Sequence, residues 1–235
     1  VSDRMLLSAL VTRGPTGTPG NAFVYVDDVV FENHPGNGWV CSSSGSRFGA
    51  VYAANLGGHG VLVDNGTVLD ASDLEYVGWL QGNTFRAVNC GGHGLAVGNP
   101  ADTSGNCSYR VSIRNLDAYS CATDAAVRYS DDQVFLYGNG IEIADSGIAG
   151  PRPLAVAGGN VRVINNRFPD APERCVHVMQ FDLTTTAVHI EAMQPVGAVS
   201  GAAVVVDLNV TGKVDIHQVS TSNISTLFSG PVNDW

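Results

Sequence analysis

Gly57-Gly58-His59-Gly60-Val61-Leu62-Val63 is followed 34 residues later by Gly91-Gly92-His93-Gly94-Leu95-Ala96-Val97. Each copy joins a glycine-rich turn to a short apolar strand. A third, degenerate copy aligns with the stretch that begins at Cys90 and reads Cys121-Ala122-Thr123-Asp124-Ala125-Ala126-Val127. A repeat of this length is typical of solenoid proteins, in which one supersecondary unit stacks on the next.

A second repeat is an alternating strand that reads apolar-x-apolar-x-polar and recurs about every 27 residues. Alternation with a period of two indicates β-strands. Asn at the polar position, as at Asn165, tolerates the left-handed backbone of a bend, and its amide can pair with the same group one coil away. We expect the first apolar residues to point inward in one stacked row: Val24, Val51, Val77, Val111, Val134, Val161, Val188 and Val214.

These repeats predict an all-β protein, a right-handed parallel β-helix of about eight coils of roughly 27 residues each. Propeller blades are longer, and leucine-rich repeats carry a Leu/Asn signature that is absent from this sequence. We expect residues 1–22 to form a neck or linker and residues 23–235 to form the β-helix. Irregular spacing predicts loops that leave the stack near Asn99 to Asn106 and between Asp145 and Pro153.

Composition narrows the range of partners. The net charge is −10 and the 12 basic residues are scattered, so the sequence disfavours nucleic acid and anionic membrane surfaces. No apolar run reaches the roughly 18 residues that span a bilayer, so we expect no membrane insertion. The five cysteines include no C-x-x-C pair, which predicts reduced thiols, Cys90 and Cys121 among them, and assembly in a reducing cytoplasm.

The segment from Val29 to Ala50 resembles an element of phage tailspikes and related pectate-lyase-like proteins. It combines an apolar strand, a Pro/Gly turn, the motif Gly38-Trp39-Val40-Cys41 and a glycine-containing hairpin that ends in Phe48-Gly49, all within residues 23–50. The resemblance implies a virion protein that is a homotrimer and contacts other virion proteins. It brings no catalytic residue and no cofactor with it.

Polar residues occupy equivalent positions before the second repeated strand. Because neighbouring coils lie about 4.8 Å apart, we expect them to form a solvent-facing column that lines a shallow glycan groove, with Asp131 and Asp132 at its edge. Trp39 is either a sugar-stacking platform or a packed aromatic. The alternative for the column is structural, with histidines that only cover backbone amides; its members are His59, His93, Asp124, Asn139 and Arg174.

The leading hypothesis from the sequence is a tailspike or capsid-decorating spike, assembled in the bacterial cytoplasm, that contacts bacterial surface polysaccharide. The first alternative is a polysaccharide-degrading glycoside hydrolase or lyase of pectate-lyase architecture. Hydrolysis requires two carboxyl groups about 5 to 9.5 Å apart, for which Asp124, Asp131 and Asp132 are the candidates. His59 and His93 alone do not make a metal site, and no cofactor-binding motif occurs. The second alternative is a purely structural virion component.

Overall fold

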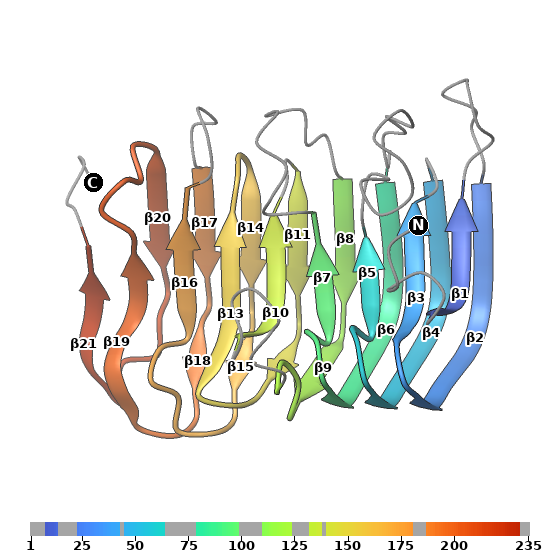
Figure 1. The fold of residues 1–235 in the computed structure, drawn as a ribbon. Coiled ribbons are helices and arrows are strands. Elements are labelled where there is room, and N and C mark those ends of the chain that lie inside the picture. Colours follow the sequence, from blue (N-terminus) through green and yellow to red (C-terminus); the bar gives the residue numbers. More distant parts are fainter. Residues whose placement is uncertain are drawn as a thin grey trace.

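The computed structural model describes residues 8–13, 23–42, 45–63, 79–98, 110–123, 132–137, 140–180 and 187–230. These residues contain strands and turns and no helix. The strands form two large sheets, of nine and twelve strands, in which neighbouring strands run parallel (Figure 1). The predicted all-β, parallel class is therefore confirmed.

The nine-stranded sheet takes one strand from each passage of the chain. In spatial order its strands are β1 (Ser8–Arg13), β3 (Asn37–Ser42), β5 (Val61–Val63), β7 (Leu95–Val97), β10 (Asp132–Tyr137), β13 (Arg152–Ala157), β16 (Val176–Met179), β19 (Val199–Val206) and β21 (Ile224–Ser229).

The twelve-stranded sheet takes the intervening segments. Its long first strands are β2 (Phe23–His34), β4 (Gly45–Leu56) and β6 (Trp79–Cys90). In each of the next four segments the long strand is replaced by two shorter ones, and the last segment contains one strand, β20. These strands are β8 (Arg110–Arg114), β9 (Leu116–Tyr119), β11 (Ile141–Ala144), β12 (Gly147–Ile148), β14 (Val161–Ile164), β15 (Arg167–Phe168), β17 (Ala187–Glu191), β18 (Gln194–Pro195) and β20 (Lys213–His217).

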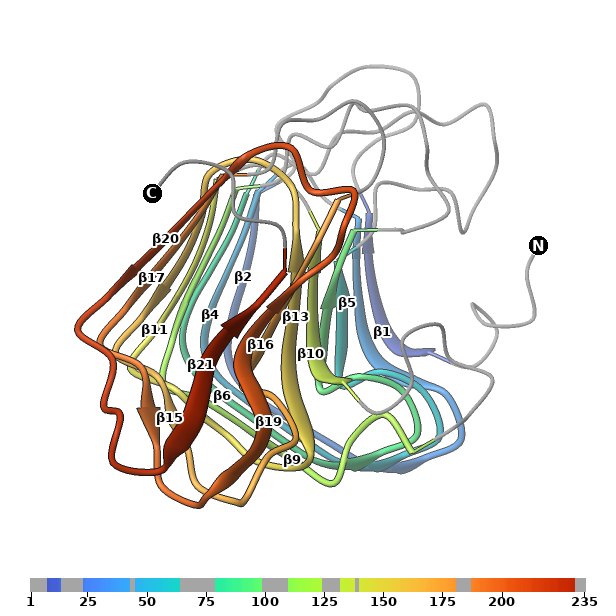
Figure 2. The same cartoon turned by 90° about the vertical axis from the view of Figure 1, so that its left-hand side faces the viewer.

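The chain alternates between the two sheets, and we call one strand of the nine-stranded sheet with the segment that follows it a pass. Each pass lies against the one before it, so strand neighbours in both sheets come from successive passes. Seen end-on, the twelve-stranded sheet bends strongly around an interior that the nine-stranded sheet closes (Figure 2). This arrangement is compatible with a β-helix-like fold.

The bends are made by residues with left-handed backbone, mostly asparagines. One series ends the long strands at Asn33, Asn55 and Asn89, each with φ of 54°. Asn89 Nδ2 donates to Asn55 Oδ1 at 2.8 Å, and Asn55 Nδ2 donates to Asn33 Oδ1 at 3.2 Å. In a second series, Asn165 Nδ2 donates to Asp145 Oδ1 at 2.8 Å. The predicted pairing of bend side chains from one pass to the next is confirmed.

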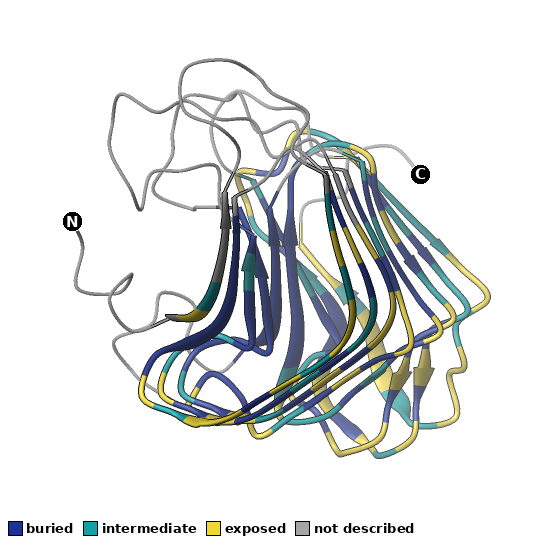
Figure 3. Ribbon diagram, turned by 90° about the vertical axis from the view of Figure 1, so that its right-hand side faces the viewer, coloured by how far each residue is buried: buried dark blue, intermediate teal, exposed yellow. Residues whose placement is uncertain are grey.

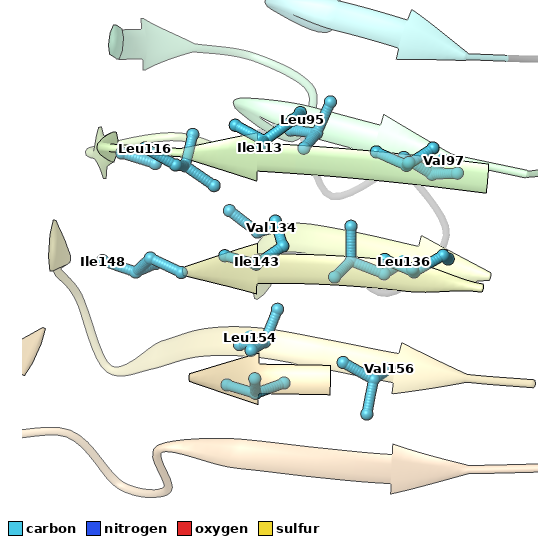
Figure 4. Packing of buried hydrophobic residues seen from close by; sticks show 14 of the residues in the cluster. Leu95, Val97, Ile113, Leu116, Val134, Leu136, Ile143, Ile148, Leu154 and Val156 are labelled. Carbon is cyan, nitrogen blue, oxygen red and sulfur yellow. The ribbon is translucent and has the colours of Figure 1, made fainter. Parts of the chain in front are cut away.

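The core lies between the two sheets and consists of apolar rows that run across the passes (Figures 3 and 4). The residues of each row are register partners in neighbouring strands, so their side chains stack directly. One long row in the nine-stranded sheet is Leu10, Trp39, Val61, Leu95, Val134, Leu154, Val176, Val204 and Phe228.

The predicted single row of valines is only partly right. Val24, Val111, Val161, Val188 and Val214 share one row of the twelve-stranded sheet. Val51 lies in another row of that sheet, opposite Val29 and Phe85, and Val134 lies in the other sheet. Val77 lies outside the described residues. The error has a simple cause, since both sheets contain alternating apolar strands of similar spacing.

Two further expectations are corrected. The predicted loop between Asp145 and Pro153 does not leave the stack, because it contains β12 and the start of β13, and Ala149 N donates to Ala118 O at 2.9 Å. The predicted hairpin ending in Phe48-Gly49 is instead a crossing between sheets, since β3 pairs with β1 and β5 whereas β4 pairs with β2 and β6. Residues 99–106 lie outside the described part, and within the predicted neck Ser8–Arg13 form β1.

The glycine-rich repeat is a place of close backbone approach. A Cβ added to Gly38 would lie 2.7 Å from Gly60 O, and one added to Gly60 would lie 2.5 Å from Gly94 O. None of these three glycines has a left-handed backbone. They are therefore required by the lack of space between stacked turns and not by an unusual φ angle.

Gly60→Ala is expected to lower the free energy of unfolding by about 1–3 kcal/mol, because its methyl group would press on the backbone of the next pass. Gly147→Ala is the matched control, since the nearest atom to its Cβ would be Asp117 Oδ1 at 3.8 Å, an ordinary contact. Urea unfolding of both variants measures the difference. Equal stability of the two variants would contradict close stacking at Gly60.

Candidate functional site

Register pairing brings six polar residues to one corner of the nine-stranded sheet. Each lies two positions before a member of the long apolar row, and we call them the polar file: Asn37, His59, His93, Asp132, Arg152 and Arg174. Of the predicted column, His59, His93 and Arg174 belong to this file. Asp124, Asp131 and Asn139 lie outside the described residues, and the register gives Asp132 and Arg152 the places expected for Asp124 and Asn139.

The first half of the file caps the backbone of the next pass. Asn37 Oδ1 accepts the His59 N–H at 2.8 Å, and His59 Nδ1 accepts the His93 N–H at 3.0 Å. His93 Nδ1 lies 2.6 Å from Asp132 O, and because a carbonyl only accepts, this nitrogen carries the proton. The rings of His59 and His93 stack with centroids 5.4 Å apart.

This half of the file is not the solvent-facing column that the sequence predicts. His93 is 3% exposed, and its ring also stacks on Phe135 at 5.6 Å. The structural alternative, histidines that cover backbone amides, describes these residues. Burial of Asn37 and His93, and partial burial of His59, are possible because these hydrogen bonds pair their polar atoms with backbone groups of a neighbouring pass.

Trp39 is a core residue with no exposed surface. It contacts Phe48 edge-to-face, with ring centroids 6.1 Å apart. A sugar-stacking platform needs an exposed ring face, which Trp39 does not offer. Of the two predicted roles, the packed aromatic is the one that the structure contains.

The second half of the file centres on a buried ion pair. Arg174 donates to Asp132 Oδ1 at 2.8 Å, with the Asp132 side chain 2% exposed and that of Arg174 19% exposed. Burial raises the pKa of Asp132, while the charge and hydrogen bond of Arg174 act in the opposite direction. Arg174 Nε and His177 Nδ1 are buried without a hydrogen-bond partner among the described residues.

Around this pair the file opens to solvent. Arg152 Nε lies 3.0 Å from Glu173 Oε2, and His177 Nε2 lies 2.8 Å from Asp207 Oδ1. Glu173 is exposed, and 43% of the Asp207 side chain is exposed. We call these residues the open end of the file: Arg152, Glu173, Arg174, His177 and Asp207.

Four of the open-end residues were missed by sequence reasoning. His177 follows the inward Val176, so strand alternation could have placed it on the outer face. Arg152 and Glu173 could have been found only with the correct register. Asp207 follows the last residue of β19, and no sequence signal links it to His177.

Cys41, Cys90, Cys121 and Cys175 carry free thiols and are buried, and Cys107 lies outside the described residues. Burial raises the pKa of the Cys175 thiol to about 12. A hydrogen bond with Cys121 and burial raise the pKa of Cys90. Since the thiolate is the reactive form, Cys90 and Cys175 are unsuited to nucleophilic catalysis.

None of the family models, curated proteins or solved structures compared with this chain matches it. Within the described ranges, no group of three or more His, Cys, Asp or Glu side chains is arranged to hold a metal ion. The same ranges contain no helix long and apolar enough to cross a membrane. The polar file is therefore a candidate site on the basis of its structure alone.

Arg174→Met removes the cation that lowers the pKa of Asp132, so the folded-state pKa of this acid rises further above its unfolded value. The variant is then most stable below the unfolded pKa of about 3.9, and it loses stability as pH rises through the folded pKa. We expect a deficit against the parent protein of about 3 kcal/mol at pH 7. The deficit should shrink towards pH 4 in denaturant unfolding.

Arg162→Met is the matched control for this pH series. Arg162 Nη1 contacts Glu142 Oε2 at 3.1 Å on the outer face of the twelve-stranded sheet, with half of the arginine exposed. Exposed pairs contribute about 0.2–1 kcal/mol, so this variant should show a small deficit. Deficits in the two variants that are equal, or that do not change with pH, would contradict a buried charge at Asp132.

Proposed function

We propose that this chain is the right-handed parallel β-helix of a phage virion spike protein, a tailspike or a capsid-decorating spike, that contacts bacterial surface polysaccharide. The alternation of passes between parallel sheets supports a β-helix, and connections between parallel strands are right-handed in nearly all proteins. The segment from Val29 to Ala50 supports the virion setting. The proposed eight coils correspond to the passages through the twelve-stranded sheet: β2, β4, β6, β8–β9, β11–β12, β14–β15, β17–β18 and β20.

The residues at the open end of the polar file are the main support for the proposal that the protein binds a glycan. It combines guanidinium, imidazole and carboxylate groups on neighbouring strands, which are spaced by about 4.8 Å. Sugars are bound through many directed hydrogen bonds, so alternating donors and acceptors at this spacing suit a chain of hydroxyl groups. The ion pairs of Arg152 with Glu173 and of Arg174 with Asp132 fix these groups before a ligand arrives.

The proposed assembly is a homotrimer that is attached to other virion proteins and forms in the bacterial cytoplasm. Apolar residues of the last pass support a contact of this kind. Val214, Ile216 and Phe228 are only partly buried, and Leu227 is 37% exposed. Partly exposed apolar groups of this kind are suited to a contact with another chain.

A polysaccharide-degrading hydrolase or lyase is the second candidate, and the state of Asp132 favours it. Burial raises the pKa of Asp132, and a raised pKa is a property of carboxyl groups that act as general acids. Glu173 or Asp207 would then supply the second carboxyl group that hydrolysis needs. The ion pair of Asp132 with Arg174 opposes this role because it favours the charged carboxylate.

Binding of capsular and O-antigen polysaccharides to the double variant Glu173→Gln/Asp207→Asn tests the proposal. We expect binding to weaken by about 1–3 kcal/mol, with an unchanged melting temperature because both acids are at the surface. Glu142→Gln is the control, since Glu142 is also an ion-paired acid but lies on the other sheet. It should bind like the parent protein.

Three results of this experiment would redirect the proposal. Normal binding by the double variant would place the glycan away from the open end. Release of new reducing ends, lost in Asp132→Asn, would identify a glycoside-cleaving enzyme. No binding to any polysaccharide, with incorporation into virions, would identify a purely structural virion component.

A further inference from the structure

A groove of about 560 Å³ lies at the corner next to the polar file. Its wall includes residues that follow β9, residues that precede β13, and one acid from the next pass. Gln133 and Pro151 in this wall are the chain neighbours of Asp132 and Arg152, so the groove borders the file. The polar and aromatic part of the lining is Tyr119, Ser120, Thr123, Gln133 and Asp170.

The groove lies beside a column of stacked turns. The turns before it stack through backbone hydrogen bonds: Gly58 N to Gly36 O and Gly92 N to Gly58 O at 2.9 Å, and Ala122 N to Gly92 O at 2.7 Å. In the following pass Ala149 N donates to Ala118 O at 2.9 Å, while the neighbouring amide of Gly150 donates to the side chain of Asp170 at 2.8 Å.

A glutamine side chain pairs with the backbone of the turn in the preceding pass. Gln133 Oε1 accepts the Cys121 N–H at 2.6 Å, and Gln133 Nε2 donates to Cys121 O at 2.9 Å. One amide side chain thus satisfies both backbone groups of Cys121 at the floor of the groove. The backbone groups of Cys121 are therefore paired without a ligand.

We propose that this groove binds one uncharged hexopyranose unit of a polysaccharide. The inference rests on the proposed function and adds a sugar subsite beside the polar file. The groove volume lies within the range of about 300–1,000 Å³ that is usual for small-ligand sites. Tyr119 provides an aromatic wall, and the exposed Ser120 and Thr123 provide hydroxyl groups for the sugar.

The aromatic wall is held in place from outside the groove. Arg86 Nη2 donates to Tyr119 Oη at 3.0 Å, and its guanidinium carbon lies 5.5 Å from the centre of the ring. Arg86 is in turn 3.4 Å from Asp117 Oδ2. A ring fixed in this way can contact the C–H face of a sugar without losing further side-chain freedom.

Charge selects against acidic sugars. Asp170 is the one charged side chain among the described residues of the lining, and it is exposed. Its Oδ2 accepts the Gly150 N–H, and we assign its Oδ1 as an acceptor for a sugar hydroxyl. A uronate in the groove would bring a second carboxylate close to Asp170, with no cation in the described lining to compensate for it.

The test is a titration of the ¹⁵N-labelled protein with methyl glycosides of glucose, galactose, mannose and N-acetylglucosamine, and with glucuronate. At least one methyl glycoside should shift the amide signals of Ser120, Cys121 and Gly150, with a dissociation constant of about 10 mM, as single sugars bind weakly. Glucuronate should leave these signals in place. No shift with any methyl glycoside, or equal shifts with glucuronate, would overturn the inference.

Asp170→Asn separates the role of the charge from that of the fold. Its amide oxygen can still accept the Gly150 N–H, so the turn is kept, while the charged acceptor for the sugar is lost. We expect affinity for the methyl glycoside to fall about tenfold. Asp145→Asn is the control, because Asp145 also accepts a hydrogen bond from a neighbouring pass but lies outside the groove lining, and this variant should bind the methyl glycoside like the parent protein. Unchanged affinity in Asp170→Asn would refute the subsite.

The experiments distinguish failure of the sugar subsite in the groove from failure of glycan binding at the open end. If the open-end double variant loses polysaccharide binding while methyl glycosides leave the groove amides unmoved, the subsite is wrong and the proposed function stands. If methyl glycosides shift the groove amides but the double variant binds polysaccharide normally, the subsite stands and the glycan does not follow the open end.

Discussion

Each pass of the chain rests on the previous one through hydrogen bonds at a shared corner, where turns approach so closely that glycine is required. Gly60 has no room for a Cβ against Gly94 O, and the amides of His59 and His93 are capped by side chains of the preceding pass. These contacts fix the register of the strands that follow. The apolar rows of the core and the outward positions of the polar side chains both depend on that register.

The same constraint divides the polar file. Where the turns stack closely, the polar side chains form hydrogen bonds with backbone groups of the next pass, as those of Asn37, His59 and His93 do. The charged side chains lie further along the stack, at the pair of Asp132 with Arg174 and at the more exposed residues around it. The groove at Tyr119 borders this region, at the turn where Gln133 pairs with Cys121 and Asp170 accepts the Gly150 N–H. Backbone stacking continues in later passes, as in the bond from Glu173 N to Pro151 O at 2.8 Å, so the candidate binding surfaces are distinguished by their exposed side chains.

The sequence predicted what depends on local chemistry. The repeat of Gly-Gly-His-Gly and the asparagines at bends such as Asn55 have physical roles visible in the residue types themselves. Register was harder, because the number of residues per pass varies, and the pairing of Leu95 with Val134 places Asp132 next to His93 where the sequence predicted Asp124. Trp39 could not be placed either, since a tryptophan in an alternating strand fits the core and the surface equally well until its row is known.

Amide hydrogen exchange at His93 measures the corner contact most directly. This amide belongs to a turn, but its N–H is donated to His59 Nδ1 and lies in a buried corner. It should exchange as slowly as the strand amides of Leu95 and Val97, and it should remain protected in His59→Asn, because asparagine performs the same capping at Asn37. In His59→Leu the protection should be lost. Rapid exchange of the His93 amide in the parent protein, at the rate of an open loop, would contradict the stacked corner.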